Sequence, residues 1–271
     1  MKPIKIAQIG MEHDHAVCAW HSLKKQPETF ELVAWAQPNP DYTITDWAKR
    51  ETEGYPCMTV EEILDIPGLE AVVIETIEHD LTKYALMAAQ RGLHVQMDKP
   101  GGHDLAEFEE LIRTVKEQRL VFQTGYMYRF NPAVKYAMEL AKSGKLGDIY
   151  AVEAHMDCLH PKTKREWLGQ YKGGMMFFLG CHLVDLIIQF KGFPDKVIPM
   201  NCATGIDGVD SEDYGFALFQ YKDGVSFAKT CAAEVNGFER RQLVICGSKG
   251  TVEIKPLEKY PVVNPTGAQN T

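Results

Sequence analysis

The sequence predicts an α/β protein in which a doubly wound parallel sheet is followed by an α+β domain with a largely antiparallel open sheet. Three observations support this fold class. Short apolar runs alternate with helical segments through about the first 120 residues, and strand-like runs follow one another after that. The length of 271 residues is also sufficient for two domains. We place these domains at residues 1–122 and 123–271.

Five apolar runs in the N-terminal part predict buried strands, because they are too short to be helices. They are residues 5–9, 32–36, 71–74, 94–97 and 120–123. A helical segment at residues 81–91 stops before Gly92, which is a typical C-terminal signal. Another begins with Asp104 and Glu107 at the spacing of a capping box. Alternating strands and helices predict right-handed crossovers and a parallel sheet.

The second half of the chain has a different pattern. Helices are expected at residues 132–142 and at about 176–190. The strand-like runs are residues 149–156, 196–203, 214–221, 225–231, 242–246 and 251–254. Asp223-Gly224 lies between two of these runs and is a strong signal for a β-hairpin. Consecutive strands with few helices predict the α+β domain.

The composition excludes several classes of protein. Hydrophobic residues make up 45% and charged residues 24%, as in an ordinary globular protein. The net charge of −8 disfavours nucleic acid, and no run reaches the ~18–20 apolar residues of a membrane span. No signal peptide is expected, and seven scattered cysteines without a Cys-x-x-Cys pair favour a reducing, cytoplasmic location. We therefore expect a small-molecule substrate, with neither nucleic acid nor membrane as a partner.

Ligands of an open parallel sheet bind beyond the carboxyl ends of its strands. The predicted loops at that edge are residues 10–16, 37–41, 76–80 and 98–102. The last loop reads Asp-Lys-Pro-Gly-Gly, so Lys99 follows a strand directly. A lysine placed there can polarise a carbonyl or exchange a proton with a hydroxyl, although a lone lysine at a strand end is usually just solvated.

Further short motifs follow a fixed order along the chain. In the N-terminal part they are Gly10 after the first strand, residues 30–34, residues 71–74 with Thr76, residues 92–95, and Asp98-Lys99-Pro100. In the C-terminal part they are Tyr128-Arg129-Phe130-Asn131-Pro132, Gly144-Lys145-Leu146-Gly147, and Gly173-Gly174 followed by His182 and Asp185. Over residues 5–254 this ordered set resembles the glucose–fructose oxidoreductase/inositol dehydrogenase (Gfo/Idh/MocA) family, in which Glu-Lys-Pro stands where this chain has Asp-Lys-Pro.

The resemblance implies a Rossmann-type N-terminal domain that binds NAD or NADP, and a sugar, polyol or related hydroxy compound as substrate. Hydride transfer at a substrate carbon would place Lys99 and His182 as catalytic residues beside the reacting hydroxyl. The expected substrate-binding residues are Tyr128, Arg129, Trp167 and Asp185. The expected cofactor-binding residues are Gly10, Glu12, His13, Gln37, Thr76, His79, Asp98, Lys99 and Pro100.

The resemblance also implies a homo-oligomer, because relatives bury the open sheet of the second domain by forming dimers or tetramers. We expect a homodimer or homotetramer that associates through this sheet. His155 and Asp157 share one face of the predicted strand at residues 149–156, so a role at the subunit contact or near the substrate is open for both. Trp167 is as well explained by packing at the surface as by a place in the substrate cleft.

The chain departs from the dinucleotide motif of this family. Gly-x-Gly-x-x-Gly lets the backbone approach a diphosphate, whereas residues 10–15 read Gly-Met-Glu-His-Asp-His. Glu12 replaces the second glycine and His15 the third, and a carboxylate ~4 Å from a phosphate costs about 4 kcal/mol at an effective dielectric constant of roughly 20. The second strand ends in Gln37 rather than in an acidic residue, and Phe178 stands where the family often has an aspartate four residues before the helix histidine.

A second hypothesis is a non-redox protein on the same scaffold, either a metal-assisted lyase or isomerase or a protein that only binds a ligand. Histidines and carboxylates crowd the crevice loops, and imidazole combined with carboxylate suits zinc, manganese or iron. The alternative metal ligands are His13, His15, His79 and His182. A purely structural explanation is also open, in which His13 and His15 lie at a helix N-terminus with Asp14 as its N-cap.

Overall fold

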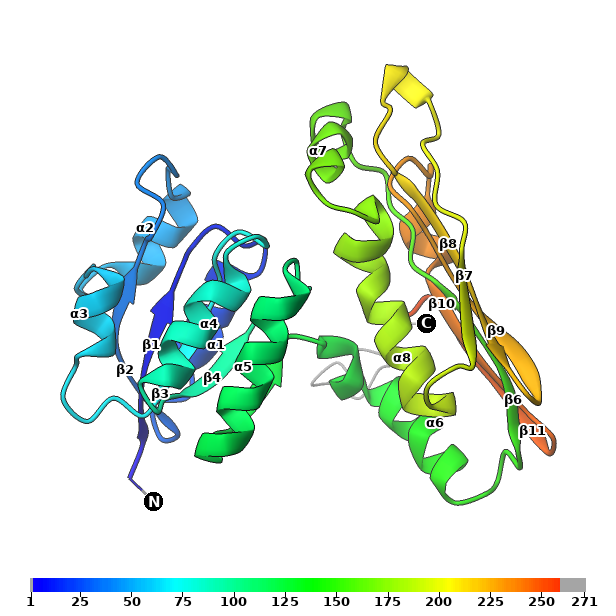
Figure 1. The fold of residues 1–271 in the computed structure, drawn as a ribbon, viewed down its shortest axis with the longest axis horizontal. Helices are drawn as coiled ribbons and strands as arrows, with labels where there is room; N and C mark the ends of the chain where they lie inside the picture. The colour runs from blue at the N-terminus through cyan, green and yellow to red at the C-terminus, as the bar shows by residue number, and fades with distance from the viewer. Residues whose placement is uncertain (1, 259–271) are drawn as a thin grey trace, which may run out of the picture. The chain divides into compact units, whose positions relative to one another are not determined.

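The structure is a computed structural model that describes residues 2–258, and the chain divides into two compact units (Figure 1). The N-terminal unit is Met1–Gly125 and the C-terminal unit is Tyr126–Thr271. The end of the predicted second domain, beyond Glu258, lies outside the described residues.

The N-terminal unit contains a five-stranded parallel sheet in the order β2-β1-β3-β4-β5. The strands are β1 (Ile4–Ile9), β2 (Phe30–Ala36), β3 (Ala71–Ile74), β4 (His94–Met97) and β5 (Phe122–Thr124). The helices are α1 (Ala16–Lys24), α2 (Asp46–Thr52), α3 (Val60–Leu64), α4 (Leu81–Gln90) and α5 (Leu105–Gln118). The strand order reverses at β1 and β3, so the carboxyl ends of these two strands form the switch point at which such sheets bind ligands.

Both faces of this sheet are covered, as a doubly wound fold requires. Ile9 and Val72 point to the face on which α3, α4 and α5 pack. Ile6 and Val73 alternate with them and pack against Leu23 of α1 on the other face (Figure 1). Near-continuous apolar strands are therefore buried on both sides.

Local sequence sets where most helices begin. Thr59 and Glu62 form a reciprocal capping box at α3, and the Asp104 carboxylate accepts the Glu107 N–H at 3.0 Å to cap α5. At α1 the expectation of Asp14 as N-cap is wrong, because the helix begins only at Ala16. The His13 carbonyl accepts the Ala16 N–H at 3.0 Å, so the preceding residues form a separate turn.

The C-terminal unit contains a six-stranded sheet in the order β11-β10-β6-β9-β8-β7, in which β6 and β9 pair in parallel and the other neighbours are antiparallel. The strands are β6 (Ile149–His155), β7 (Lys196–Pro199), β8 (Tyr214–Tyr221), β9 (Gly224–Cys231), β10 (Gln242–Gly247) and β11 (Gly250–Ile254). The helices are α6 (Pro132–Lys142), α7 (Lys162–Trp167) and α8 (Cys181–Lys191). The hairpin predicted at Asp223-Gly224 joins β8 to β9, with Lys222 and Asp223 as the two turn residues and Gly224 paired with Tyr221.

Helices α6 and α8 lie on one face of this sheet (Figure 1). Leu186 and Ile187 of α8 pack there against Ala217 and Phe219 of β8. On β8 the residues that alternate with these point to the opposite face and are only partly buried. The predicted fold class, a doubly wound parallel sheet followed by an α+β unit, is confirmed.

Several predicted elements differ in extent from the observed ones, and the strand expected at residues 120–123 lies at Phe122–Thr124. The strand expected at residues 196–203 ends at Pro199, which has no N–H to donate, and resumes only as an isolated pairing of Cys202 with Tyr214. The helix expected at about 176–190 begins with a π-helical turn, Met176–Gly180, before α8. The wider turn and α8 are continuous in the chain, and His182 lies on the first turn of α8.

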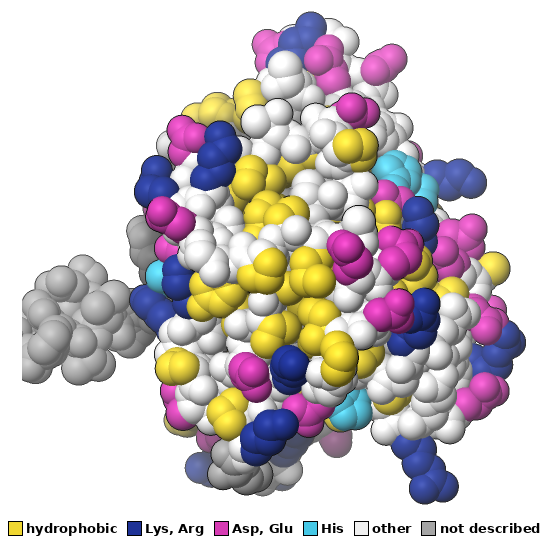
Figure 2. Space-filling model, turned by 90° about the vertical axis from the view of Figure 1, so that its left-hand side faces the viewer, with side chains coloured by type: hydrophobic (Ala, Val, Ile, Leu, Met, Phe, Trp, Pro, Cys, Tyr) yellow, Lys and Arg dark blue, Asp and Glu magenta, His cyan; other side chains and the backbone are white. Residues whose placement is uncertain are grey.

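The surface of the face shown in Figure 2 mixes both charges. Lysine and arginine side chains alternate there with aspartate and glutamate around patches of hydrophobic side chains. Within the described residues, every helix is too short or too polar to cross a membrane.

Candidate functional site

Three loops meet at the switch point of the N-terminal sheet. They follow β1, β3 and β4, and they carry His13, Glu75 and Asp98 respectively. Gly10 makes this approach possible, because a Cβ on this residue would lie 2.5 Å from the backbone of Glu75 and Thr76. Its φ of +99° is also one that other residues rarely adopt. The single glycine retained from the dinucleotide motif therefore has a structural function in this chain.

His13 is almost completely buried in this crevice, at 4% exposure. Its Nε2 lies 2.9 Å from the Lys99 carbonyl oxygen, which can only accept, so Nε2 carries the hydrogen. Its Nδ1 lies 3.1 Å from Oδ2 of Asp98. The two nitrogen atoms thus connect the loop after β1 to both residues at the end of β4.

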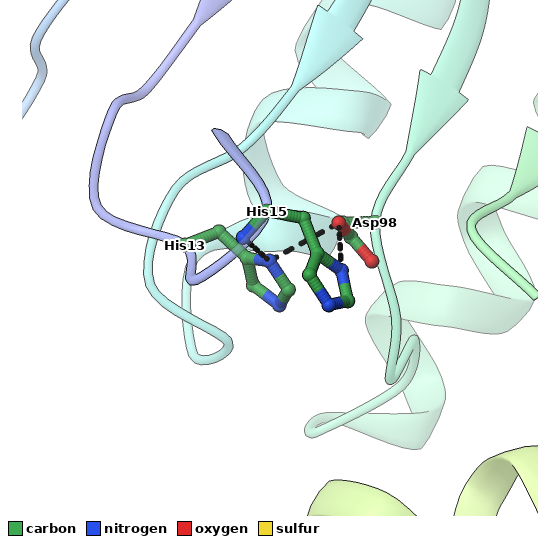
Figure 3. A group of neighbouring side chains, drawn as sticks. All are labelled: His13, His15 and Asp98. Carbon is green, nitrogen blue, oxygen red and sulfur yellow. Dashed lines mark hydrogen bonds and ion pairs between the residues drawn. The ribbon is translucent and has the colours of Figure 1, made fainter. Parts of the chain in front are cut away.

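His15 approaches Asp98 from the solvent side. Its Nδ1 lies 2.9 Å from the same Oδ2 atom, and its ring meets the His13 ring edge to face with centroids 4.9 Å apart. Figure 3 shows the two imidazoles side by side, both directed at the carboxylate. One ligand atom from each of His13, His15 and Asp98 lies within 4.8 Å of the others, which is close enough for the three to share a metal ion.

The crevice contains a surplus of carboxylates. Glu75 is 1% exposed, and neither of its carboxyl oxygens has a hydrogen-bond partner among the described residues. Burial, reinforced by the nearby Asp98, raises the pKa of Glu75 well above its ordinary value. Burial alone would also raise the pKa of Asp98, but the adjacent imidazoles of His13 and His15 hold it below its ordinary value. Lys99, at 2% exposure, is a buried cation in the same region.

The backbone donors of the loop after β1 already have protein acceptors. The Met11 N–H donates to Oε1 of Gln37 at 3.0 Å, and the N–H groups of Glu12 and His13 donate to the Glu75 carbonyl at 3.2 and 3.1 Å. The Glu12 carboxylate accepts a hydrogen bond of 2.7 Å from Asn39, which holds it beside the loop.

A diphosphate needs free backbone N–H groups and a loop without negative charge. In this arrangement three N–H groups of the loop are engaged and Glu12 adds a negative charge, so the loop is less favourable to a diphosphate than the glycine motif is. Gln37, expected to contact the ribose, is occupied as well, because its Nε2 donates to the Asn39 carbonyl at 3.3 Å.

Two further residues expected to contact the cofactor lie in the loop after β3. Thr76 is buried and its hydroxyl donates to the Ile77 carbonyl at 3.3 Å. His79 lies against His103, with ring centroids 3.9 Å apart, rather than in the group of His13, His15 and Asp98. Pro100 follows Lys99 at the end of β4 and is buried.

The candidate residues of the C-terminal unit gather around the first turn of α8. His182 is 3% exposed and meets the rings of Tyr126 and Tyr128 edge to face, with centroids 5.9 and 4.8 Å apart. Arg129 binds the Asp185 carboxylate through two guanidinium nitrogens, and this hydrogen bonding raises the pKa of Arg129. Three of the four expected substrate-binding residues therefore lie with His182 on η1 (Met127–Phe130) and α8.

The remaining expected substrate-binding residue lies in a separate cluster. Trp167 packs edge to face against Tyr171 and Phe178, and the Lys164 ammonium lies 3.8 Å from the centre of its ring. Phe178 is thus part of a hydrophobic cluster, which accounts for an apolar residue at the position where the family often has an aspartate.

The contributions of Glu75 and Asn39 are not predicted by the sequence, and Asp98 is not among the predicted alternative metal ligands. Glu75 directly follows the predicted strand at residues 71–74, so its place at the crevice edge could have been inferred from the strand itself. The contact of Asn39 with Glu12 depends on how two loops fold, and no local signal indicates it.

Comparison with known proteins identifies the family. Residues 5–126 match the model of the oxidoreductase family with an NAD-binding Rossmann fold, and residues 134–253 match the Gfo/Idh/MocA C-terminal domain. The two matches define a two-domain oxidoreductase scaffold. The chain belongs to the Gfo/Idh/MocA family, which confirms the resemblance found in the sequence.

Individual relatives are more distant. The uncharacterized oxidoreductase YhhX of Escherichia coli is 33% identical over 138 residues, which cover 51% of this chain and 40% of YhhX. The 2,7-anhydro-N-acetylneuraminate hydratase of Mediterraneibacter gnavus is 23% identical over 263 residues, covering 94% of this chain and 68% of the hydratase. The first three curated relatives are matched over only 40%, 54% and 61% of their own length.

Solved structures share the fold. The WlbA dehydrogenase of Bordetella pertussis, in complex with NADH and UDP-GlcNAcA, superposes with a TM-score of 0.82 at 20% identity. The superposition covers 94% of this chain and 79% of WlbA. At this level of identity the likeness concerns the fold.

Proposed function

We propose that this chain acts as an oxidoreductase on a hydroxyl-bearing small molecule, a sugar, a polyol or a related compound, with NAD or NADP as the hydride carrier. The observation that carries the proposal is the position of Lys99. This lysine lies at the carboxyl end of β4. Its backbone N–H donates to Oδ1 of Asp98 at 2.5 Å, and its backbone carbonyl accepts from Nε2 of His13 at 2.9 Å. Both backbone groups of a buried lysine are thereby held beside the switch point.

The chemistry assigns different tasks to the two catalytic candidates. Oxidation of an alcohol removes a hydride from carbon, which nicotinamide accepts when bound, and a proton from the hydroxyl. Lysine and histidine can both transfer protons near neutral pH. In the proposal Lys99 holds or moves the hydroxyl proton. His182 of the C-terminal unit is the second proton-transfer candidate, and the rings of Tyr126 and Tyr128 pack edge to face against it.

Substitution of these two residues tests the proposal. Lys99→Ala and His182→Ala should each lower kcat for the active substrate by about 10²–10⁴-fold, as expected for loss of a general acid or base. Lys116→Ala and His21→Ala are the matched controls, because both side chains are substantially exposed outside the site. Turnover unchanged by Lys99→Ala, in a variant with unaltered circular dichroism, would contradict the role of Lys99.

Dinucleotide binding is measured separately, because the engaged N–H groups and the Glu12 carboxylate make the loop after β1 less favourable to a diphosphate. We expect weak binding of NAD, NADH, NADP or NADPH by calorimetry, and tighter binding by Glu12→Gly, which removes the carboxylate held by Asn39. Asp41→Gly, at an exposed residue of the neighbouring loop, is the control. If neither the unaltered chain nor Glu12→Gly binds any of the four at about 1 mM, the oxidoreductase proposal fails.

The occupied loop favours a second candidate, a non-redox enzyme or ligand-binding protein on the same scaffold. Met11, Glu12 and His13 already donate within the protein. One relative is named as a hydratase rather than as a dehydrogenase. Loss of water from a sugar or polyol, or its isomerisation, without added dinucleotide would support this candidate over the first.

Self-association through the C-terminal sheet is part of the proposal. Phe216, Leu218 and Phe227 lie on the sheet face opposite α8 and are partly exposed, and Phe216 stacks on Phe227. A dimer or tetramer would bury them. Light scattering should give a mass that is a multiple of 30.5 kDa for the unaltered chain. Leu218→Glu should reduce the measured mass to that of the monomer. The control Leu105→Glu, on the exposed side of α5, should leave the mass unchanged.

A cytoplasmic location is also proposed. Within the described residues none of the seven cysteines forms a disulfide, including the exposed Cys18, Cys57 and Cys202, which is usual in a reducing compartment. Cell fractionation with an antibody to the chain would test it.

A further inference from the structure

The strongest unexplained feature of the molecule is the group formed by His13, His15 and Asp98. Nothing in the proposed oxidoreductase chemistry requires two imidazoles on one carboxylate oxygen at the switch point. We propose that these three side chains bind a divalent transition-metal ion of the zinc type. The proposal concerns the ion alone, so it holds or fails independently of the reaction proposed for the chain.

The distances agree with a shared ion. Zinc binds imidazole nitrogen and carboxylate oxygen at roughly 2.0–2.2 Å, so two donors on one ion lie about 3–3.5 Å apart. Oδ2 of Asp98 lies 3.1 Å from Nδ1 of His13 and 2.9 Å from Nδ1 of His15. Small side-chain adjustments would therefore suffice for all three donors to reach one ion (Figure 3).

The protonation of His13 favours an ion at Nδ1. Because Nε2 donates its hydrogen to the Lys99 carbonyl, the neutral ring has a lone pair on Nδ1. The backbone N–H of His15 donates a long hydrogen bond of 3.2 Å to this nitrogen, which a bound ion would replace, and the Asp98 carboxylate faces it from 3.1 Å. Two lone pairs that face each other repel, so the contact with Asp98 requires a cation, either a proton or a metal. Metal-binding histidines usually donate their other N–H to a carbonyl or carboxylate, as His13 does.

Glu75 is an independent indication that a cation belongs here. Its carboxyl group is buried without a hydrogen-bond partner among the described residues, and Oε2 lies 3.6 Å from Nδ1 of His13. Glu78 lies 3.8 Å from Nε2 of the same ring. Three carboxyl groups thus surround one imidazole, and Lys99 supplies one positive charge. The Glu75 carboxyl group bears a desolvation cost with no hydrogen bond to offset it, and a bound cation would stabilise its carboxylate form.

The surroundings suit an ion that keeps an open coordination position. The side chains of His13 and Asp98 are 0% and 5% exposed, whereas that of His15 is 36% exposed. The ion could therefore enter past His15, and water or a ligand oxygen could occupy its remaining positions. Three protein ligands with an open position are typical of catalytic rather than structural zinc sites.

Metal titration tests the proposal directly. After treatment with a chelator, the full chain is titrated with Zn²⁺ by calorimetry and with Co²⁺ by visible absorption. One equivalent should bind to the unaltered chain. His15→Ala and Asp98→Asn should each weaken it by about tenfold or more, since each removes a donor. His15→Ala is the safer variant for folding, because this side chain is the exposed member of the group.

His21→Ala is the matched control. His21 forms another histidine–carboxylate pair on the same unit, with Nδ1 3.2 Å from Glu51, and it lies outside the group. The control should bind Zn²⁺ as the unaltered chain does. The proposal is overturned if the unaltered chain binds no equivalent, if His15→Ala binds as tightly, or if the Co²⁺ spectrum shows thiolate charge transfer in place of nitrogen and oxygen ligation.

Discussion

Buried charges are arranged differently in the two units. In the N-terminal unit, Glu75 and Asp98 lie together at the ends of neighbouring strands, and Glu75 has no hydrogen-bond partner among the described residues. In the C-terminal unit, Arg165 and Asp213 are 2% and 0% exposed and bind each other, and the Asp213 carboxylate also accepts the Thr204 N–H at 2.7 Å. The crevice of the N-terminal unit gathers several acidic groups around one buried cation, Lys99, whereas Arg165 and Asp213 of the C-terminal unit neutralise each other.

This difference separates charges that serve the fold from charges that serve a site. In a buried ion pair, each charge compensates the other. Removing one partner leaves the other charge buried and uncompensated in a medium of low dielectric constant, which destabilises the fold. A surplus of one sign stabilises nothing by itself and is tolerated where something else binds. Glu75, Asp98 and His13 belong to the second class, whereas Arg165 and Asp213 belong to the first.

The largest effect is expected from Arg165→Ala. This change leaves Asp213 buried without its cation, so the free energy of unfolding of the C-terminal unit should fall by about 3–5 kcal/mol. Arg165 also binds the Ile206 carbonyl at 3.0 Å and Asp207, so the loop that carries these residues should loosen as well. Urea denaturation followed by circular dichroism measures the change.

Arg91→Ala is the matched control for Arg165→Ala. Arg91 pairs with Asp65 at the surface, where the two side chains are 48% and 67% exposed, and such a pair contributes about 0–1 kcal/mol. If both arginine variants lost the same small amount, the contrast between the two units would be wrong, because the buried pair would then be no more important than an exposed one.

An intermediate effect is expected from Gly10→Ala, which probes how the crevice of the N-terminal unit is held together. The added Cβ would lie 2.5 Å from the Glu75 backbone, and the residue would keep a φ of +99°, so a loss of about 3 kcal/mol is expected. The loop after β1 would also move away from β3.

Gly54→Ala separates the two causes of destabilisation, the close contact of the added Cβ and the positive φ of the backbone. Gly54 has a φ of +83°, but nothing lies within 4 Å of the Cβ it would acquire, so only the backbone strain of about 1–2 kcal/mol applies. Thermal unfolding of both variants gives the comparison. Equal losses would show that close contact with Glu75 does not matter, and that the crevice is less tightly held than the structure indicates.

The sequence predicts the scaffold of the crevice better than its contents. The strand at residues 71–74 is a short, continuous apolar run, a pattern typical of a parallel strand buried on both faces, and the strand at residues 94–97 alternates apolar with polar residues. The structure has both within the predicted bounds. Lys99 at a strand end follows from the same pattern. The strands and the place of Lys99 depend on residues that are adjacent in the sequence, so the hydrophobic pattern predicts them.

The contents of the crevice depend on contacts between distant segments. Glu75 meets Gly10 and Asp98 only because β1 and β4 both flank β3, and this order is a property of the whole sheet. Among the alternative metal ligands, His13 and His15 lie together, while His79 lies against His103, since side-chain direction in a loop is not encoded by spacing. The occupation of the loop donors by Gln37 and Glu75 depends equally on the folded loops.

The smallest effect concerns His155, whose surroundings are opposite to those of His13. Burial lowers the pKa of His155 below its ordinary value of 6.5, and the nearby cations Lys229, Arg240 and Lys255 lower it further, against an opposing contribution from Glu234. Below pH 6.5 the unfolded chain therefore binds more protons at this residue than the folded chain does. Stability should fall as the pH drops through this value.

His155→Gln should lose less thermal stability than the unaltered chain when the pH is lowered from 7.5 to 5.5, values on either side of about 6.5. If the unaltered chain and His155→Gln lost the same thermal stability over this interval, burial and the surrounding cations would not lower the pKa of His155. The proposed difference between the surroundings of His155 and His13 would then be wrong.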